Sequence, residues 1–397
     1  MNFELTTQHK RIQAQCRELA TDFATRAAEH DREASNPVEN YALLREAEFH
    51  TLNIPTELGG WGEQLFGHSL ALEQLAQGCP ATALSFNMHL AWVGYLMENI
   101  EIASDVKQRV ADWVVKGNNL VAGSTSEAST SALLASYAPA TQARPVDGGY
   151  VINGKKFFSS MVGAADFRAV PARREDATTP GAAIVFLVPR DAPGQTVEEV
   201  WDVLGMRGTR SDCLLLEDCF VPEESVVFDT DNFFPSIARG ANWFWASYTA
   251  VYLGVAAAIY TEILKVVQER VPKGFTQPMA YHPDVRRKVA EMNADLESAR
   301  LNVYHSAWLS DTEGPTQNAI AALYRAKYLV GEATARIGRN ALTLGGAHTL
   351  FKSSPLERLF RDGTVGAIQF PPSDFCLSSL GSLELGLDPH EIPPPMK

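Results

Sequence analysis

Hydrophobic positions recur with two different periods along this chain, and the change of period divides it into three regions. In the first region the spacing is helical: Leu19, Phe23 and Ala27 recur every four residues between polar positions, which is typical of one face of an amphipathic helix. Two more apolar helices are predicted at Ser69–Gln77 and Thr82–Asn99, with Pro80 marking a stop between them.

Near residue 120 the pattern changes to that of β-strands. The run Tyr150–Phe158 predicts a strand, a turn at Asn153–Gly154 and a second strand, because Asn-Gly is the strongest short signal for a hairpin turn. Further strands are predicted at Ala183–Val188, Cys213–Leu216 and Cys219–Val221. This middle region is therefore expected to be mostly β.

The helical pattern returns at about residue 235 and predicts the antiparallel helices of a bundle at Trp243–Val271, Pro283–Asp311 and Thr316–Gly345. Residues 243–260 carry no charge over 18 positions, the length at which a membrane span is considered. The segment is rich in Ala, Tyr, Ser and Thr and continues into Glu262 and Lys265. These features favour a buried bundle helix over a membrane span.

The three regions predict an α+β protein. We expect an N-terminal helical domain (residues 1–120), a central antiparallel β-barrel or sandwich-like domain (121–232), and a C-terminal four-helix bundle with its tail (233–397). A length of 397 residues suffices for two or three domains. The 46% hydrophobic and 20% charged residues suit a globular protein with a large core.

Charge and cysteine content narrow the functional classes. A formal net charge of −13 argues against binding a nucleic-acid backbone, which needs clustered Lys and Arg. The five cysteines are widely spaced without a C-x-x-C, and no H-x-x-x-H pair occurs. No disulfide framework or metal site is predicted, and the first residues lack a signal-peptide pattern. A cytoplasmic location is expected.

The segment from Leu344 to Pro372 carries the most distinctive motifs. It contains Gly345-Gly346, then Arg361-Asp362, then Gln369-Phe370. Earlier in the chain stand four more segments: Pro55-Thr56-Glu57-Leu58-Gly59-Gly60-Trp61-Gly62, Leu72–Ala76 followed by Ala83 and His89, Gly154–Ser160 followed by Ala165-Asp166, and Leu204–Gly208 with Glu217-Asp218 and Val221-Pro222.

In this order the segments resemble those of the FAD-dependent acyl-CoA dehydrogenase superfamily. The resemblance covers residues from about 50 to 372 and implies a helical, β, helical fold with FAD between the β-domain and the final bundle. Members of the family carry a catalytic Glu after the Arg-Asp pair. Counting from Arg361-Asp362, that position here holds Phe370, so this chain resembles a divergent member without the usual base.

A displaced base is the alternative. Some branches of the family place the Glu on the bundle helix over the flavin, a position near Phe244 here, but residues 241–248 contain no carboxylate. Asp374 remains as a weak candidate for the base. Asp362 is interpreted as the structural partner of an arginine.

The resemblance also implies which residues contact FAD. Ser160 replaces a family Thr whose hydroxyl lies near flavin N5, and Phe158 replaces a Trp beside the flavin ring. Loop 124–131 would hold the flavin carbonyls and the pyrophosphate, although it could also be an ordinary polar edge loop. The implied cofactor residues are Ser124, Ser126, Ser131, Phe158, Ser160, Arg270, Phe275, Gly345, Gly346 and Gln369.

Part of this set serves a neighbouring subunit in the family. Arg270, with Lys273 as its alternative, and Phe275 would reach the FAD of the neighbour, and Gly345-Gly346 would let the backbone approach its adenosine end. A site completed in this way requires an oligomer, and the resemblance implies a homodimer or homotetramer.

The implied activity is α,β-desaturation of an acyl thioester, with hydride transfer to flavin N5 and later reoxidation by an electron acceptor. A backbone N–H of the catalytic segment would polarise the thioester carbonyl, and the amide of Phe370 can still supply it. Three alternatives stay open: a flavin-dependent monooxygenase of the same fold, a base-less subunit of a hetero-oligomer, and a purely structural helical protein.

Overall fold

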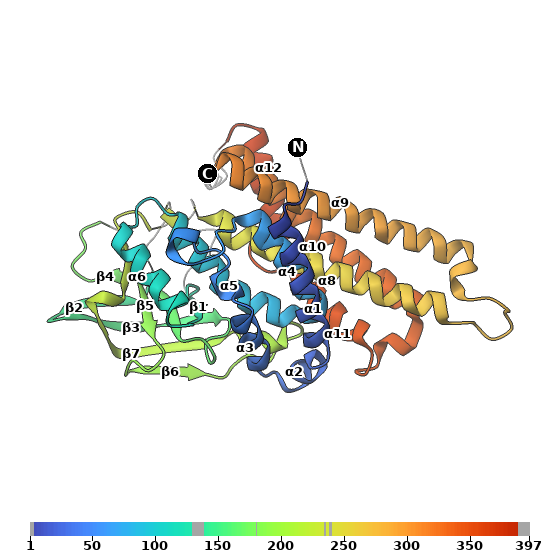
Figure 1. Cartoon of the computed structure of the whole chain (residues 1–397), viewed down its shortest axis with the longest axis horizontal. Helices are drawn as coiled ribbons and strands as arrows, with labels where there is room; N and C mark the ends of the chain where they lie inside the picture. Colours follow the sequence, from blue (N-terminus) through green and yellow to red (C-terminus); the bar gives the residue numbers. More distant parts are fainter. Residues whose placement is uncertain (1–3, 129–138, 180, 234–235, 238–239, 388–397) are drawn as a thin grey trace, which may run out of the picture.

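The structure is a computed structural model that describes residues 4–128, 139–179, 181–233, 236–237 and 240–387. Figure 1 shows its arrangement: the β-strands lie at one end, the long C-terminal helices at the other, and the N-terminal helices cross the region between them. The predicted order of helical, β and helical regions is confirmed.

The N-terminal region is helical. Its helices are α1 (Thr7–Ala24), α2 (Ala27–Glu33), α3 (Val38–Glu46), α4 (Leu65–Gly78), α5 (Pro80–Glu98) and α6 (Ser104–Val115). Nearly every side chain of α4 and α5 is buried, which explains why their apolar positions extend around the whole helix. Pro80 is the first residue of α5, where its missing N–H has no helical partner in any case.

The middle region is one eight-stranded sheet with the order β6-β7-β3-β2-β4-β5-β8, and β1 pairs with β4. Its strands are β1 (Val121–Gly123), β2 (Gln142–Val146), β3 (Gly149–Ser159), β4 (Phe167–Arg174), β5 (Ala183–Pro189), β6 (Gln195–Glu198), β7 (Asp212–Pro222) and β8 (Val226–Thr230). Neighbours are antiparallel except the pairs β1–β4 and β2–β4. The buried run after Ala183 forms β5 as predicted, whereas the two short strands expected after Cys213 form the single strand β7.

The hairpin predicted at Asn153–Gly154 is wrong. Strand β3 runs through this dipeptide, and its pairing with β7 shifts by one residue there, as in a β-bulge. The asparagine pairs across the strands: Asn153 Nδ2 donates to Asp218 Oδ1 at 3.2 Å, and the Asp218 amide donates to Asn153 Oδ1 at 2.8 Å. A Cβ on Gly154 would lie 2.4 Å from Thr141 Oγ1, so close approach selects this glycine.

The C-terminal region is again helical, with α8 (Ala241–Glu269), α9 (Pro283–Glu313), α10 (Gln317–Gly345), α11 (Pro355–Thr364) and α12 (Ser373–Glu384). Among the described residues, one helix, at 242–269, is long and apolar enough to cross a membrane, but 67% of that apolar window is buried within the protein. Helix α8 lies among α4, α5, α9 and α10. Its composition therefore reflects the core of the helical regions, as expected.

A buried histidine joins the N-terminal helices to the sheet. His89 on α5 accepts a hydrogen bond at Nδ1 from the amide of Val121, the first residue of β1, at 3.0 Å. Its Nε2 donates to the carbonyl of His50 at 2.8 Å. These partners require a neutral ring, and burial lowers the pKa of His89 to about 3. The start of the sheet is thus fixed to α5 only while this imidazole is uncharged.

We predict that His89→Gln flattens the dependence of stability on pH. The folded pKa lies below the unfolded value of about 6.5, so between these values only the unfolded state takes up the proton. The stability that depends on this ring is complete above pH 6.5 and decreases as the pH falls, by up to about 1.4 kcal/mol per pH unit. Thermal unfolding midpoints measured from pH 7 to 4.5 should fall less steeply in the variant. His282→Gln, at a half-exposed site, is the control, and equal slopes for His89→Gln and the native protein would contradict the prediction.

Candidate functional site

Two loops of the β-domain meet in strained backbone conformations. One is the end of β3 with the turn after it, which carries Ser160, and the other is residues 206–211 before β7. Half of the eight non-glycine residues with positive φ in the described part of the chain lie in these loops: Phe158, Met161, Met206 and Arg210. Such conformations cost free energy and collect at functional sites. Strain therefore marks the region where Ser160 lies.

Ser160 is the end of a buried row of hydroxyl groups. Its Oγ lies 2.7 Å from Ser211 Oγ, which lies 2.8 Å from Thr209 Oγ1. All three residues are buried. Beside them, the Phe158 side chain is 65% exposed and stands edge-on to Trp201, with ring centroids 6.1 Å apart. An aromatic ring left open beside a buried hydroxyl is suited to a flat ligand.

The loop that begins at Ser124 is anchored by a buried ion pair. Lys156 Nζ donates to Glu127 Oε1 and, at 2.7 Å, to the carbonyl of Pro171. Glu127 also accepts hydrogen bonds from the amides of Ala140 and Thr141. Burial alone would raise the pKa of Glu127, but Lys156 and these hydrogen bonds hold it below its ordinary value. The pair closes the base of the loop and fixes its first residues against β3.

Two hydroxyls near this loop have no hydrogen-bond partner in the described part of the chain. The hydroxyls of Ser124 and Ser159 are buried and make no hydrogen bond with the described residues, although buried hydroxyls are usually paired. Ser126 is exposed and accepts a hydrogen bond at its carbonyl from the Phe157 amide, at 2.8 Å. Ser131 lies outside the described residues. Unpaired hydroxyls, the exposed Phe158 ring and Ser160 together fit a polar, planar cofactor.

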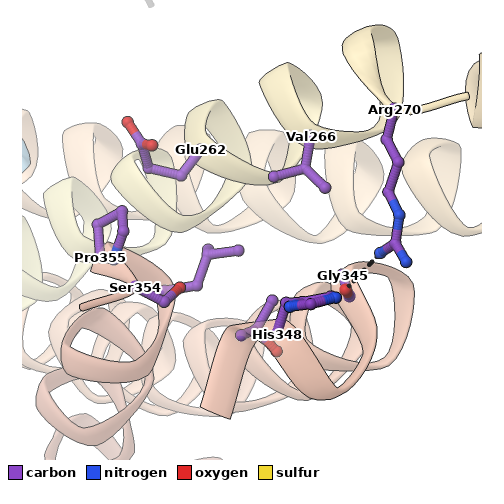
Figure 2. Close-up of a pocket in the computed structure, with 9 residues that line it drawn as sticks. Glu262, Val266, Arg270, Gly345, His348, Ser354 and Pro355 are labelled. Carbon is purple, nitrogen blue, oxygen red and sulfur yellow. Dashed lines mark hydrogen bonds between the residues drawn. The ribbon is translucent and has the colours of Figure 1, made fainter. Parts of the chain in front are cut away.

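A second group of predicted residues meets at the far end of the bundle. Arg270 Nη1 donates to the carbonyl of Gly345 at 3.0 Å, and both residues line a cavity of about 230 Å³ (Figure 2). His348 and Ser354 line the same cavity, and Ser354 precedes the first turn of α11. A guanidinium beside the amino end of a helix is suited to an anionic group such as a phosphate.

The glycines at this cavity permit a tight turn. Gly346 has a φ of +68°, and a Cβ on Gly345 would lie 2.2 Å from Thr349 Cγ2. Phe275 lies on the nearby loop between α8 and α9 and is 64% exposed. Of the predicted cofactor residues, Arg270 and the two glycines are therefore brought together, with Phe275 on an adjoining loop.

The two groups lie far apart in one chain. Figure 1 shows the loop after α8 at the opposite end of the molecule from the β-strands. Tyr252 of α8 contacts Gln369, and Arg270 stands at the end of the same helix. The two residues are 18 positions apart, or roughly 27 Å along the helix axis. The Gln369 contact and the cavity at Arg270 therefore lie at separate places along α8.

A cluster of four aromatic side chains includes Phe370, at the position expected for a catalytic base. Phe370 lies 5.9 Å from Trp245 and 5.3 Å from Phe375, and Tyr324 lies 5.3 Å from Trp245 and 6.0 Å from Phe375, measured between ring centroids. We call Trp245, Tyr324, Phe370 and Phe375 the aromatic quartet. A phenylalanine side chain cannot accept a proton. The quartet therefore forms an apolar surface at residue 370, the position at which a catalytic base was considered.

The backbone beside the quartet is held by buried polar groups. Gln369 accepts a hydrogen bond at Oε1 from the hydroxyl of Tyr252. Lys327 Nζ donates to the Gly366 carbonyl at 2.7 Å, and burial lowers the pKa of Lys327 to about 8. No carboxylate of the described residues forms an ion pair with Lys327. In contrast, the amide N–H of Phe370 makes no hydrogen bond with the described residues.

The acidic candidates lie elsewhere. Asp374 is exposed in the first turn of α12. Asp362 is buried and accepts a hydrogen bond from the Met206 amide at 2.6 Å, and burial raises its pKa to about 6. Phe244 packs against Trp92, with centroids 5.2 Å apart. The hydrogen-bond partner of Asp362 is thus the Met206 amide, and no ion pair of the described residues joins Asp362 to an arginine as predicted. Residues 244 and 370, the two positions considered for a base, carry no carboxylate.

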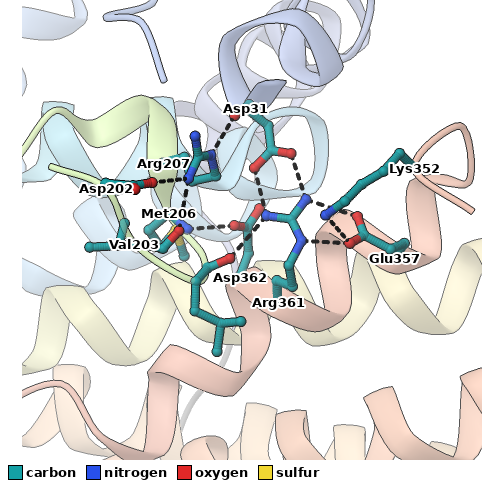
Figure 3. Close-up of polar contacts among 10 residues, drawn as sticks. Asp31, Asp202, Val203, Met206, Arg207, Lys352, Glu357, Arg361 and Asp362 are labelled. Atoms are coloured by element: carbon teal, nitrogen blue, oxygen red, sulfur yellow. Dashed lines mark hydrogen bonds and ion pairs between the residues drawn. The ribbon is translucent and has the colours of Figure 1, made fainter. Parts of the chain in front are cut away.

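The Arg-Asp motif joins three parts of the chain (Figure 3). Arg361 donates through Nη1 to Asp31 Oδ1 of α2 at 2.9 Å, through Nε to Glu357 Oε1 at 2.8 Å, and through Nη1 to the Leu204 carbonyl at 3.0 Å. A Cβ on Gly205 would lie 2.4 Å from the Arg361 carbonyl oxygen. The two motifs, which are distant in sequence, therefore contact each other: Leu204–Gly208 and Arg361-Asp362. We call this contact the interdomain junction.

The site predicted from the sequence omitted several buried polar residues. Lys156, Lys327, Thr209 and Ser211 were not chosen, although each is buried in the structure. Lys156 stands in the quoted Gly154–Ser160 segment, and Thr209 and Ser211 directly follow Leu204–Gly208. Their position within or directly after these segments was an available signal. For Lys327, the apolar face of its helix gave no indication of a buried ammonium.

Comparisons with known sequences cover almost the whole chain. Residues 6–105, 122–219 and 234–370 match the N-terminal, middle and C-terminal domains of acyl-CoA dehydrogenases. The protein YdbM of Bacillus subtilis (strain 168), whose name describes it as an acyl-CoA dehydrogenase, is 33% identical over 356 residues, which are 90% of this chain and 91% of the relative.

Solved structures give the same fold. Butyryl-CoA dehydrogenase from Megasphaera elsdenii superimposes with a TM-score of 0.88 at 22% identity, covering 97% of this chain and 100% of that chain. KijD3, in complex with FMN and dTDP-3-amino-2,3,6-trideoxy-4-keto-3-methyl-D-glucose, superimposes with a TM-score of 0.85 at 24% identity, covering 97% and 95%. At these identities the likeness concerns the fold.

We predict that Arg361→Gln destabilises the protein strongly. The side chains of Arg361, Asp31 and Glu357 are only 10, 15 and 13% exposed, so the change leaves Asp31 without a cation among the described residues and Glu357 with Lys352 alone, which costs roughly 3 kcal/mol. The thermal midpoint should fall by about 5 °C or more. Arg287→Gln removes an exposed ion pair with Glu291, which has the same i,i+4 spacing as the pair of Arg361 with Glu357. This control should change the thermal midpoint by little. Equal effects of the two substitutions would refute the role of the junction.

Proposed function

Because the chain belongs to the acyl-CoA dehydrogenase family, we propose that it oxidises an acyl thioester at the α,β-carbons, with FAD as the hydride acceptor. The family is FAD-dependent, and the fold also accommodates FMN in KijD3. Reoxidation of the cofactor then requires a separate electron acceptor. The proposed setting is a soluble, cytoplasmic protein.

The observation that carries this proposal is the free backbone amide of Phe370. It lies in the segment where the family polarises the thioester carbonyl, and it has no hydrogen-bond partner among the described residues. Lys327 and Tyr252 hold the neighbouring backbone and the Gln369 side chain in place. A preorganised donor aimed at a carbonyl oxygen stabilises the negative charge that develops there when the α-proton leaves.

The proposed cofactor contacts follow the two groups of residues. Ser160, Phe158, Ser124 and Ser126 would contact the flavin end, with Gln369 at the bundle side. Bound FAD supplies an acceptor for two electrons at its N5 atom. The buried Ser124 hydroxyl without a partner and the exposed Phe158 ring support this assignment.

Arg270, Phe275, Gly345 and Gly346 would contact the diphosphate and adenosine end of a cofactor bound by a second copy. Their distance from the Ser160 group in one chain supports a homodimer or homotetramer as the functional form. The exposed side chains of Phe275, Leu350 and Phe351 near the same cavity give such a contact an apolar component.

A second candidate function follows from the aromatic quartet. Without a carboxylate at residue 370, removal of an α-proton needs a base from another position, and Asp374 is an exposed candidate for that role. A flavin-dependent monooxygenase needs no such base. KijD3, with the same fold, is in complex with FMN and a dTDP-sugar in its solved structure. A base-less subunit of a hetero-oligomer is the remaining alternative.

We predict that Arg270→Gln weakens retention of FAD at least about tenfold, because a hydrogen bond from a charged group contributes about 1.5 to 3 kcal/mol. The dissociation constant is measured from visible absorbance after dilution and gel filtration. Arg287→Gln, at an exposed site on α9, is the control and should retain FAD like the native protein. Undiminished affinity of Arg270→Gln would remove Arg270 from the cofactor site.

We predict that Phe370→Glu accelerates thioester-dependent bleaching of the flavin by about tenfold or more, because a positioned general base typically contributes a factor of 10² to 10⁴. The measurement is anaerobic mixing with a panel of acyl-CoAs. Phe375→Glu places the same carboxylate one aromatic neighbour away, with ring centroids 5.3 Å apart in the native protein, and should not accelerate it.

Two outcomes decide between the candidates. If neither the native protein nor Phe370→Glu is bleached by any acyl-CoA, while a flavin reductase and oxygen yield hydroxylated product, the monooxygenase is correct and the dehydrogenase is not. If acyl-CoA bleaches the flavin of the native protein but not that of Asp374→Asn, Asp374 is the displaced base.

A further inference from the structure

The row of hydroxyls behind Ser160 has a direction. Thr209 Oγ1 lies 2.8 Å from the carbonyl oxygen of Met206, 2.8 Å from Ser211 Oγ, and Ser211 Oγ lies 2.7 Å from Ser160 Oγ. The row therefore ends on a carbonyl, which accepts hydrogen bonds but cannot donate. Thr209 is fully buried, and Ser211 and Ser160 are 5 and 7% exposed, so water does not supply alternative partners along it.

Counting hydrogens gives that direction. Each hydroxyl has one hydrogen. If Thr209 donates to Met206, it accepts from Ser211, and Ser211 in turn accepts from Ser160. All three hydrogens are then used within the row, and Ser160 has only lone pairs left. The opposite direction leaves the Ser160 hydrogen without an acceptor in the described chain. The Met206 carbonyl also accepts from the Thr209 amide and Trp201 Nε1, both at 3.1 Å, but the Thr209 hydroxyl is its shortest contact.

We propose that Thr209 and Ser211 are positioning residues that hold Ser160 as a hydrogen-bond acceptor toward the bound flavin and thereby favour its reduced form. The proposal rests on the proposed function, in which Ser160 contacts the flavin end of FAD, with its hydroxyl near flavin N5 as the family resemblance implies. An oxidised flavin presents a lone pair at N5, whereas the two-electron-reduced flavin presents an N–H there. A Ser160 oxygen without a free hydrogen matches the N–H and repels the lone pair.

The backbone around the row supports its role. Phe158 and Met161 flank Ser160, and Met206 and Arg210 flank Thr209, all with positive φ. The Met161 amide donates to the Thr209 carbonyl at 3.0 Å and fastens the two loops together. Four non-glycine residues keep an unfavourable conformation where three hydroxyls form a row with 2.7 and 2.8 Å between successive oxygens, and strain of this kind serves preorganisation.

The test is the midpoint potential of the flavin in Ser211→Ala, measured by equilibration with a reference dye and recorded from the visible absorbance. Without Ser211 the Ser160 hydrogen is free to point at oxidised N5. The equilibrium should shift several-fold, up to about tenfold, toward the oxidised flavin, and tenfold corresponds to a decrease of about 30 mV for a two-electron couple. Thr209→Val, nearly equal in volume, should shift it in the same direction, because Ser211 loses its acceptor and donates to Ser160 instead.

Ser306→Ala is the matched control, since it removes a buried hydroxyl that donates to Val303 within α9. Its potential should equal that of the native protein. An unchanged or increased potential in both Ser211→Ala and Thr209→Val, with flavin still bound, overturns the proposal and leaves the proposed function intact. A native protein that binds no flavin overturns both. Flavin content measured for every variant before the titration separates these outcomes.

Discussion

The interdomain junction is the contact on which the remaining structure depends. Arg361 brings together a carboxylate from the first forty residues, the carbonyl of Leu204 from the β-domain and Glu357 from its own helix. Asp362 then fixes the Met206 amide. Because Met206 begins the loop that ends at Ser211, the same contact that joins the domains also sets the position of the hydroxyls behind Ser160. Interdomain stability and site geometry are therefore coupled through a few polar atoms.

The site itself combines a retained and a lost element of its family. The backbone amide at residue 370 is free to donate, while the side chain at that position joins an aromatic wall. Positioning of a carbonyl and removal of a proton are separate physical tasks, and in the proposed function only the first has a group assigned to it. A chain of this kind illustrates that membership of a family identifies the scaffold and the cofactor with more certainty than the reaction.

The sequence was sufficient for the order of domains because long periodic segments, such as α8 and α10, leave little ambiguity between helix and strand. It failed at Asn153–Gly154, where a turn signal lies inside a strand and pairs with Asp218, 65 residues away. Residues within motifs, such as Ser160 and Arg270, could be selected as site candidates from the sequence. Contacts were inaccessible where they arise from side chains that meet only after folding, as for Lys327 with Gly366 or Thr209 with Ser211.

The spacing of Arg361 and Asp31 along the chain has a consequence for biosynthesis. The two residues are 330 positions apart, and a ribosome adds roughly 5 to 20 residues per second. The helix that carries Asp31 therefore emerges roughly 15 to 65 s before its partner is made. During that interval α2 lacks its ion pair with Arg361, so the contact that joins the first helices to α11 forms only when translation is almost complete.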